Sequence, residues 1–328
     1  MEAEARRRRW HHLRRALSIL FALAVVGLLV HWARNVHWAD VLNALQNYPA
    51  TTLLAAAGVA LSSHALYSTY DLIGRHQARH ALRPGQVVGV AFVSYAFNLN
   101  LGSLVGGFAM RYRLYSRLGL SMPVITQVLG LSLLTNWLGY AFVAGIAFLL
   151  APPELPASWE LGTGGLRALG CALIVLAITY VGVCFKARRR EWTIRQHRVV
   201  LPSGPIALWQ LGVSATNWAL IASVMYLLLL HHVQYSAVLS VLLVAAVAGV
   251  ITHVPAGLGV LEAVFVALLA GPASEAELIA ALLAYRALYY LVPLALAAIV
   301  LLRFESRSPN RESRRSGRRP IADSSYTG

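Results

Sequence analysis

Long apolar runs separated by short polar segments dominate the chain. Six of these runs are uninterrupted and have 18 residues or more, and a helix needs about 20 apolar residues to cross the roughly 30 Å hydrocarbon core of a bilayer. The six runs cover residues 16–33, 50–73, 122–151, 166–185, 206–230 and 278–302. Two further apolar stretches, near 86–118 and 236–270, are broken by glycine, proline or polar residues. The pattern predicts an all-α polytopic membrane protein with six full spans and two broken segments.

The composition supports a membrane protein and argues against a nucleic-acid-binding one. Hydrophobic residues make up 58% of the 328 residues and charged residues only 12%, which leaves too little polar surface to cover a water-soluble globule. The net charge of +15 comes from arginines in short blocks between apolar runs, as in cytoplasmic flanks, rather than on one amphipathic face. The two cysteines, Cys171 and Cys184, lie in one apolar run, where a helix separates them by roughly 20 Å, so no disulfide framework is expected.

The distribution of basic residues predicts the orientation. If the N-terminus is cytoplasmic, 25 of the 28 lysines and arginines fall on the cytoplasmic side, and the C-terminus is cytoplasmic as well. Arginine blocks lie on both sides of the first broken stretch, and a single crossing cannot place both blocks in the cytoplasm. Non-basic loops flank the second broken stretch. We therefore expect two re-entrant hairpins, one from each face, and eight membrane elements in all. Backbone freed at such breaks is tolerated where it is buried in protein or lines a wet cavity.

The order of the elements suggests an inverted repeat. Residues 16–151 read as two spans, a hairpin and a span, and residues 165–302 repeat that order with the opposite orientation. Inverted repeats of this kind build substrate sites where their interrupted segments meet near the bilayer midplane. The 16–302 unit follows a basic N-terminal segment, 1–15, and its first run is expected to be an uncleaved helix. The tail, 303–328, is rich in arginine and serine, lacks apolar periodicity and is expected to be disordered.

The first broken stretch, "NLNLGSLVGGFAMRYRLYSRLG", combines two asparagines, four glycines and three arginines. A turn between Gly102 and Gly107 predicts a returning helix whose N-terminal dipole and first-turn Arg111 face the cavity, with Arg113 nearer the cytoplasm. A helix N-terminus together with guanidinium groups is suited to binding a phosphate. The alternative is that these arginines only extend their charged ends to the membrane–water interface. Two roles stay open for Asn98 and Asn100: they bind a lipid headgroup, or they only form hydrogen bonds within the turn.

Other ionisable residues in apolar runs are costly in lipid and are therefore candidates for a site. His64, Tyr67 and Asp71 share one helical face, and Asp71 either pairs with Arg111, gates the cavity or sits at the interface next to Arg75. Glu262 follows the segment Pro255 to Gly259, so we expect it in the first turn of the second hairpin's returning arm. Arg286 lies within a span and needs an anionic partner, which is Glu262, Asp71 or a bound headgroup.

Several enzyme classes lack their residues in this sequence. Lys186 is the only lysine and lies in a basic loop, which argues against a nucleotide-binding P-loop and a Schiff-base enzyme. The sequence contains neither HExxH nor Cys/His metal spacing nor a G-x-S-x-G elbow. We therefore expect no metal, cofactor or catalytic residue. The function classes that remain are transport and lipid handling.

Three sequence blocks resemble one known family. "GGFAMRYRLYSRLGLS", "VPAGLGVLEAVF" and "YRALYYLVPLALA" are similar to conserved blocks of the lysylphosphatidylglycerol synthase transmembrane (flippase-like) family, which includes the membrane part of the multiple peptide resistance factor. The resemblance implies a flippase-like domain whose functional acidic and basic positions are Asp71, Arg111 and Glu262. Ala256 replaces a glycine of the family pattern. The soluble aminoacyl transferase domain of the resistance factor has no counterpart in this sequence, so no synthase activity is expected.

The sequence thus leads to a lipid translocator in a bacterial inner membrane. Its partners would be lipids with anionic or zwitterionic headgroups, whose phosphate meets Arg111, Arg113 and Arg286. The alternative is an intramembrane lipid-modifying enzyme, with His64 or His253 as base, or an accessory or scaffold subunit for a partner lipid synthase.

Overall fold

The computed structural model describes residues 48–156, 162–188, 190–194, 197–252 and 259–306, and a few isolated positions before residue 48. The predicted basic N-terminus, the first span at 16–33, His253, Ala256 and the tail from residue 307 lie outside this part of the chain. Predictions about them, including the inverted repeat that needs the first span, stay predictions.

Within the described residues, six helical segments are long and apolar enough to cross a membrane. They are Ala50–Ala78, Met122–Leu150, Thr163–Lys186, Gly204–Leu228, Tyr235–Thr252 and Glu275–Phe304. The all-α polytopic class is confirmed. Five of the six match predicted spans, whereas Tyr235–Thr252 belongs to the stretch expected to be broken. The helix ends at Thr252, just before the segment Pro255 to Gly259 where the sequence predicted the break, but it is long enough to cross a membrane, which the prediction of a re-entrant segment did not include.

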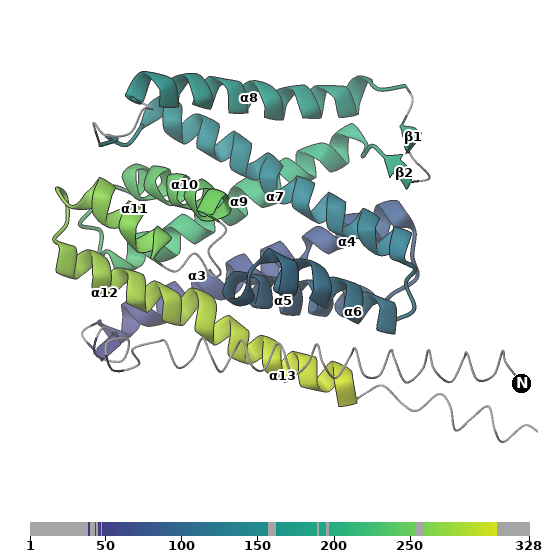
Figure 1. Ribbon diagram of the computed structural model, residues 1–328, viewed down its shortest axis with the longest axis horizontal. Coiled ribbons are helices and arrows are strands. Elements are labelled where there is room, and N and C mark those ends of the chain that lie inside the picture. Colours follow the sequence, from purple (N-terminus) through teal and green to yellow (C-terminus); the bar gives the residue numbers. More distant parts are fainter. Residues whose placement is uncertain are drawn as a thin grey trace, which may run out of the picture.

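The elements follow one another in a simple order (Figure 1). The helices are α3 (Ala50–Ser68), α4 (Tyr70–Ala78), α5 (Pro84–Leu101), the π-helical η1 (Ser103–Ala109), α6 (Met110–Arg117), α7 (Met122–Leu150), α8 (Thr163–Lys186), α9 (Gly204–Leu228), α10 (Tyr235–Thr252), α11 (Val260–Leu269), α12 (Glu275–Tyr285), the π-helical η3 (Arg286–Leu291) and α13 (Val292–Ser306). The basic loop after α8 contains a short hairpin of β1 (Glu191–Ile194) and β2 (His197–Val200), which the sequence did not predict.

The first broken stretch forms a helical hairpin. α5 ends at Gly102, whose φ of 82° lies in the left-handed region that glycine adopts without strain, and η1 and α6 then run back along α5. A Cβ on Gly106 would lie 2.1 Å from the backbone nitrogen of Asn98. The glycines after the turn therefore serve close contact between the two arms. Where this hairpin lies relative to a bilayer stays a prediction.

A second pair of helices, α10 and α11, packs together at the opposite end of the bundle. In Figure 1, α10 and α11 occupy the left half of the view and α5 and α6 the right half. Gly259, with φ 80°, precedes α11. Central helices α3 and α9 pack against each other, and α13 covers α5. The two hairpins thus approach each other from opposite ends.

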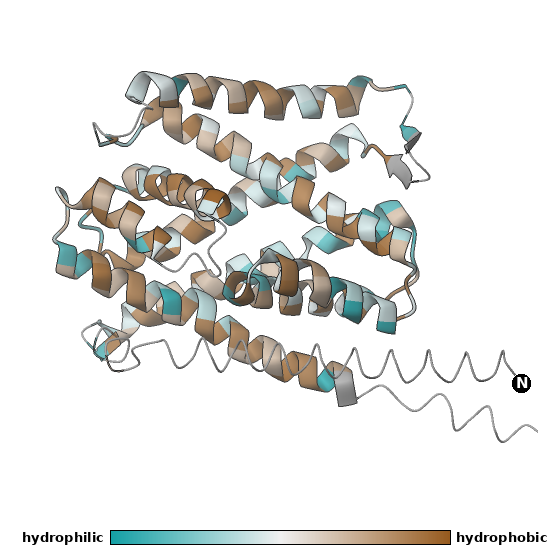
Figure 2. Ribbon diagram, in the orientation of Figure 1, coloured by the Kyte–Doolittle hydropathy of each residue, from teal (hydrophilic) through white to brown (hydrophobic). Residues whose placement is uncertain are grey.

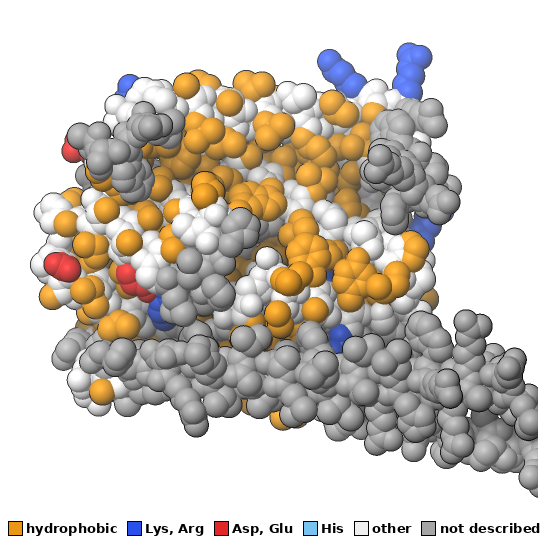
Figure 3. Space-filling model, in the orientation of Figure 1, with side chains coloured by type: hydrophobic (Ala, Val, Ile, Leu, Met, Phe, Trp, Pro, Cys, Tyr) orange, Lys and Arg blue, Asp and Glu red, His pale blue; other side chains and the backbone are white. Residues whose placement is uncertain are grey.

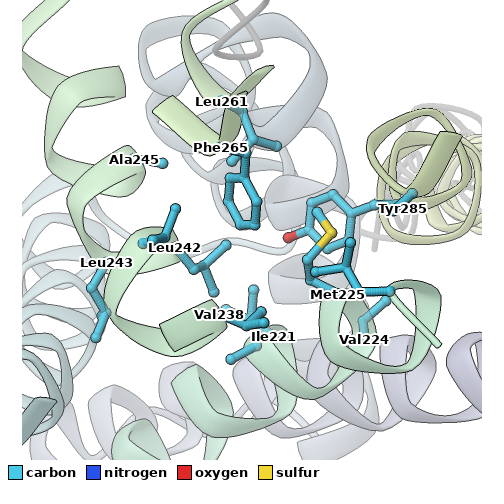
Figure 4. Close-up of a cluster of buried hydrophobic side chains, with 14 of the residues drawn as sticks. Ile221, Val224, Met225, Val238, Leu242, Leu243, Ala245, Leu261, Phe265 and Tyr285 are labelled. Carbon is cyan, nitrogen blue, oxygen red and sulfur yellow. The ribbon is translucent and has the colours of Figure 1, made fainter. Parts of the chain in front are cut away.

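Apolar side chains fill the interior and also cover the outside of the bundle (Figures 2 and 3). A buried cluster joins α9, α10, α11 and α12, with Met225, Leu242 and Phe265 among its members (Figure 4). On α8, exposed side chains include Leu176 at 63% and Ile178 at 61%. Such a surface is costly in water but not in the hydrocarbon region of a bilayer, so it identifies the lipid-facing side of a multi-pass membrane protein.

Candidate functional site

A buried ion pair ties the first hairpin to the rest of the bundle. Arg111 on α6 donates from Nε to Oδ2 of Asp71 on α4 at 3.0 Å and from Nη2 to Oδ1 at 3.2 Å. The two side chains are 2% and 0% exposed. Tyr115 donates its hydroxyl to Asp71 at 2.8 Å. Of the alternatives left open for Asp71, the structure selects the pair with Arg111.

Pairing with Asp71 compensates the charge of Arg111, which the first hairpin would otherwise bury without a counter-ion. The guanidinium also contacts the carbonyl oxygen of Gly107 and the hydroxyl of Ser132, each at 3.4 Å. A bidentate pair with extra hydrogen bonds offsets much of the desolvation cost of two buried ions. In this conformation the guanidinium of Arg111 is engaged by protein groups.

The expected position of Arg111 at a free helix N-terminus is wrong. The returning arm begins at Ser103 as η1, and Arg111 lies on α6 after it. The prediction failed because it assigned the turn to the whole glycine-rich run, whereas Gly102 alone reverses the chain. The free N–H groups of this arm lie near Ser103 instead.

A second ion pair ties the other hairpin to the last long helix. Arg286 of η3 donates to both carboxylate oxygens of Glu262, with 2.9 Å between Nη2 and Oε2. The backbone N–H of Gly259 donates to the same Oε2 at 2.9 Å, so Glu262 caps α11. Glu262 lies in the first turn of the helix after the Pro-Gly segment, as predicted, whereas the re-entrant nature of that segment stays a prediction. The structure shows Glu262 as an anionic partner of Arg286. Arg286 also lies 5.5 Å from the ring centroid of Tyr290.

The two pairs play the same structural role. In each hairpin the returning arm carries one member, Arg111 or Glu262, and a helix of the bundle carries the other. We call the Asp71–Arg111 and Glu262–Arg286 pairs the two latches. Breaking either latch separates one arm from the helix that carries the other member of the pair, and each ion of that pair loses this partner.

Removing the carboxylate of the second latch tests its contribution to stability. We expect Glu262→Gln to lower the free energy of unfolding by about 1–3 kcal/mol, because the charge-assisted hydrogen bonds from Nε and Nη2 of the buried Arg286 to the carboxylate are lost. Thermal unfolding in detergent measures the change, with Glu275→Gln, an exposed position on α12, as control. Equal melting temperatures for the two variants would contradict the latch.

A cavity of about 680 Å³ lies between the tip of the first hairpin and the end of α10 with the start of α11. Its walls come from α5 and η1, from α9, α10 and α11, and from α12 and η3. The lining residues are Tyr95, Asn98, Leu99, Leu101, Gly102, Ser103, Leu104, Val105, Trp218, Ile221, Leu242, Ala245, Ala246, Gly249, Val250, Val260, Leu261, Tyr285, Tyr289 and Tyr290. Figure 4 views the apolar side of this region, where Leu242, Leu261 and Tyr285 face one another. The volume falls in the range typical of small-molecule and cofactor pockets.

The predicted site residues take different places around this cavity. Asn98 belongs to the wall, and the amide of Asn100 donates to the carbonyl oxygens of Ala96 and Tyr290. Tyr67 stacks on Tyr95 with ring centroids 3.6 Å apart, behind the wall.

The charged candidates lie outside the wall. Arg113 is half-buried on α6, and no latch residue belongs to the cavity wall, although Glu262 and Arg286 each follow directly after a residue of that wall. Among the described lining residues there is no arginine, lysine, aspartate or glutamate. The part of the cavity that the structure describes is therefore aromatic and polar but uncharged.

A buried hydrogen-bond network behind the wall escaped the sequence analysis. Ser63 on α3 donates to Oδ1 of Asn217 on α9 at 2.8 Å and also contacts the hydroxyl of Tyr289 at 2.8 Å, which lies 3.0 Å from that of Tyr95. Tyr289 lies in the third sequence block and Ser63 next to His64, so both carried a signal. The contact between α3 and α9 that joins them was not visible in sequence.

Metal binding finds no support in the described residues, where no group of three or more His, Cys, Asp or Glu side chains comes together. The polar side chains of the described cavity wall are those of four tyrosines, Asn98, Ser103 and Trp218.

Comparison with known families identifies the chain. The model of the lysylphosphatidylglycerol synthase TM region matches residues 18–297, which is most of the sequence. The chain belongs to this family. Its three sequence blocks include α6, most of α11, and η3 with the start of α13. They contain three of the four latch residues, Arg111, Glu262 and Arg286, and the second and third blocks contribute five residues to the cavity wall.

Individual relatives agree with this assignment. The chain is similar to the inner membrane protein YbhN of Escherichia coli (strain K12), with 47% identity over 92% of this chain and 95% of that protein. It is also similar to an uncharacterized protein of Synechocystis, with 32% identity over 90% of this chain and 92% of that protein. A phosphatidylglycerol lysyltransferase of Bacillus subtilis is 24% identical over 85% of this chain but only 33% of its own length. Members of the family thus include both lipid-modifying enzymes and a protein named for the inner membrane.

Proposed function

We propose that this chain moves a polar membrane lipid between the leaflets of a bacterial inner membrane. The observation that carries the proposal is the cavity of about 680 Å³ where two opposed hairpins meet inside an apolar-surfaced helical bundle. A headgroup enters this cavity while the acyl chains remain in the bilayer. The names of two relatives, an inner membrane protein and a phosphatidylglycerol lysyltransferase, support a role in lipid handling.

The latches supply a mechanism for alternating access. Opening the first hairpin separates Arg111 from Asp71, and the phosphate of an anionic or zwitterionic headgroup replaces the carboxylate as the partner of the guanidinium. Opening the second hairpin separates Glu262 from Arg286 in the same way. Each open state then exchanges a protein ion pair for a protein–lipid one, so the two states differ little in free energy and both are populated.

Filling the cavity tests the proposal most directly. Gly249 lies on the cavity wall, and a Cβ at this position meets nothing within 4 Å, so Gly249→Phe places a ring in the cavity without a backbone clash. We expect this variant to slow lipid movement at least tenfold in vesicles that contain fluorescent phosphatidylglycerol, as measured by dithionite bleaching of the outer leaflet. The matched control is Gly182→Phe on α8, where a Cβ also meets nothing within 4 Å outside the cavity.

The outcomes separate three functions. Slow movement in Gly249→Phe and normal movement in Gly182→Phe supports the translocator. Purified protein that leaves leaflet distribution unchanged but alters lipid composition on thin-layer chromatography indicates an intramembrane enzyme instead. No change in either measurement refutes translocation and leaves an accessory role.

Cysteine labelling tests the placement of the first hairpin. In a variant without Cys171 and Cys184, we expect cysteines at positions 83 and 117 to react with a membrane-impermeant maleimide from the cytoplasmic side. A cysteine at position 275, before which the loop carries no basic residue, should react from the opposite side. Opposite accessibility of positions 83 and 117 would mean that the segment between them crosses the membrane, which the proposal excludes.

A further inference from the structure

His64 is a buried histidine that the proposed translocation does not yet use. It lies on α3, seven residues before Asp71 and on the same helical face, and it is 0% exposed. Its ring lies 5.0 Å from that of Tyr95 and 4.7 Å from that of Tyr289, centroid to centroid. Both tyrosines line the cavity, so His64 sits one side chain behind its wall.

The hydrogen bonding of His64 fixes its tautomer. Nδ1 lies 3.0 Å from the carbonyl oxygen of Ala60. Because a carbonyl only accepts, Nδ1 carries the hydrogen, and in the neutral ring Nε2 then presents a lone pair. Within the described residues Nε2 is buried and has no hydrogen-bond partner. A buried acceptor without a partner is rare and costs free energy, which points to a ligand in another state of the protein.

None of the described side chains that contact the His64 ring carries a charge. The rings that face His64 are Phe92 and Tyr95 of α5 and Tyr289 of η3. From α9, Asn217 reaches the adjacent Ser63. The titratable residues on its own helical face are Tyr67, which stacks on Tyr95, and Asp71, whose charge Arg111 balances. The surroundings of His64 thus change charge only if His64 itself takes up a proton.

A directed hydrogen-bond chain runs beside the ring. Ser63 donates its single hydrogen to Asn217, so the hydroxyl of Tyr289 donates to Ser63, and the hydroxyl of Tyr95 donates to Tyr289. The amide nitrogen of Asn217 is also buried without a partner among the described groups. Two unpartnered polar atoms beside one network, one acceptor and one donor, are groups of the kind that bind buried water or a proton.

We propose that Nε2 of His64 binds a proton from the hydrated cavity, and that this binding couples lipid movement to a transmembrane proton gradient. This inference rests on the proposed function. The proton adds to the lone pair of Nε2 in one hairpin-open state and leaves from the same nitrogen in the other, with no other bond changed. In the conformation described above the ring is fully buried, and burial disfavours an imidazolium without an anionic partner. Protonation therefore favours the open state and is linked to the conformational change.

The coupling makes a quantitative prediction. One proton per lipid and a gradient of one pH unit supply about 1.4 kcal/mol, enough for a leaflet ratio of the lipid of up to about tenfold. The ratio depends on thermodynamic coupling alone, so it is the same for protein inserted in either orientation.

The experiment uses vesicles of phosphatidylcholine that contain the full-length protein and fluorescent phosphatidylglycerol. The leaflet ratio is read from the fraction that dithionite bleaches, at equal pH and with a gradient of one unit. Wild type should give an even distribution at equal pH and an uneven one under the gradient. His64→Gln keeps an amide donor for the carbonyl of Ala60 but cannot titrate, so it should still move lipid and should give an even distribution in both conditions. His76→Gln, an exposed position on α4, should behave as wild type.

The results distinguish this inference from the function on which it rests. Lipid movement by wild type without any effect of the gradient overturns the coupling and leaves the translocator intact. An uneven distribution that persists in His64→Gln overturns the role of His64. Absence of lipid movement by wild type refutes the proposed function, and the coupling with it. If His64→Gln melts well below wild type, His64→Asn is compared in the same way.

Discussion

Asp71→Asn is expected to lower the free energy of unfolding by about 3–5 kcal/mol and to stop lipid movement. The reason is that Arg111, which is 2% exposed, then keeps its charge without the carboxylate that both Nε and Nη2 engage. Removing one member of a buried ion pair is costly because the other ion stays buried without compensation. Unfolding in detergent, followed by tryptophan fluorescence or by thermal shift, measures the change.

A double-mutant cycle separates the pair from other effects. Arg111→Gln should also destabilise, and the variant with both substitutions should be more stable than the two single effects predict, because it buries no unpaired ion. Glu154→Gln at an exposed position is the control. Additive effects of Asp71→Asn and Arg111→Gln would contradict the first latch.

The same reasoning changes how Arg111→Ala should be read. This substitution leaves Asp71, which is 0% exposed, without its guanidinium partner, although Tyr115 still donates to it. Loss of lipid movement in Arg111→Ala therefore combines loss of a headgroup contact with loss of stability. Only a variant that stays folded, such as the double substitution, can separate the two causes.

Gly106→Ala is expected to give the second largest effect, a destabilisation of about 3 kcal/mol, because overpacking at a backbone contact reaches the upper end of the usual range. The added Cβ would lie 2.1 Å from the nitrogen and 2.4 Å from the Cα of Asn98. These are backbone atoms of α5, so the two arms of the hairpin must separate. We expect lipid movement to fall with stability, since Asn98 and the tip of this hairpin line the cavity.

A glycine without neighbours supplies the control. At Gly58 on α3 a Cβ meets nothing within 4 Å, and Gly58→Ala should stabilise the helix by about 0.5–1 kcal/mol. The comparison uses thermal unfolding of the two variants in one detergent. Unfolding of Gly106→Ala at the same temperature as Gly58→Ala would mean that the arms do not touch at Gly106.

The sequence located the elements of the site better than their partners. It placed Glu262 in the first turn of the helix that follows the Pro-Gly segment and offered Asp71 as one partner for Arg111, and the structure confirms both positions. It placed Arg111 at a free helix N-terminus, which is wrong because Gly102 alone turns the chain. A glycine-rich run looks the same in sequence whether its glycines bend the backbone or let two backbones approach.

Two tyrosines illustrate the same limit of prediction from sequence. Tyr289 and Tyr290 lie in a family block, but nothing in the block predicts that Tyr289 bonds to Ser63 and Tyr95, which are 226 and 194 positions away. Their contact requires α3, α5 and η3 to meet. Residue type suggested a polar site, and helix packing assembled it.

The sequence alone determined that this is a multi-pass helical membrane protein, which segments are apolar and broken, and to which family it belongs. These properties follow from transfer free energies that add along the chain and from short motifs, both of which are local. Only the tertiary structure decided which carboxylate neutralises which arginine, where the cavity lies and how the latches are placed relative to it. Those features join residues as far apart as Ser63 and Asn217, and their energies depend on distance and burial after the helices have packed.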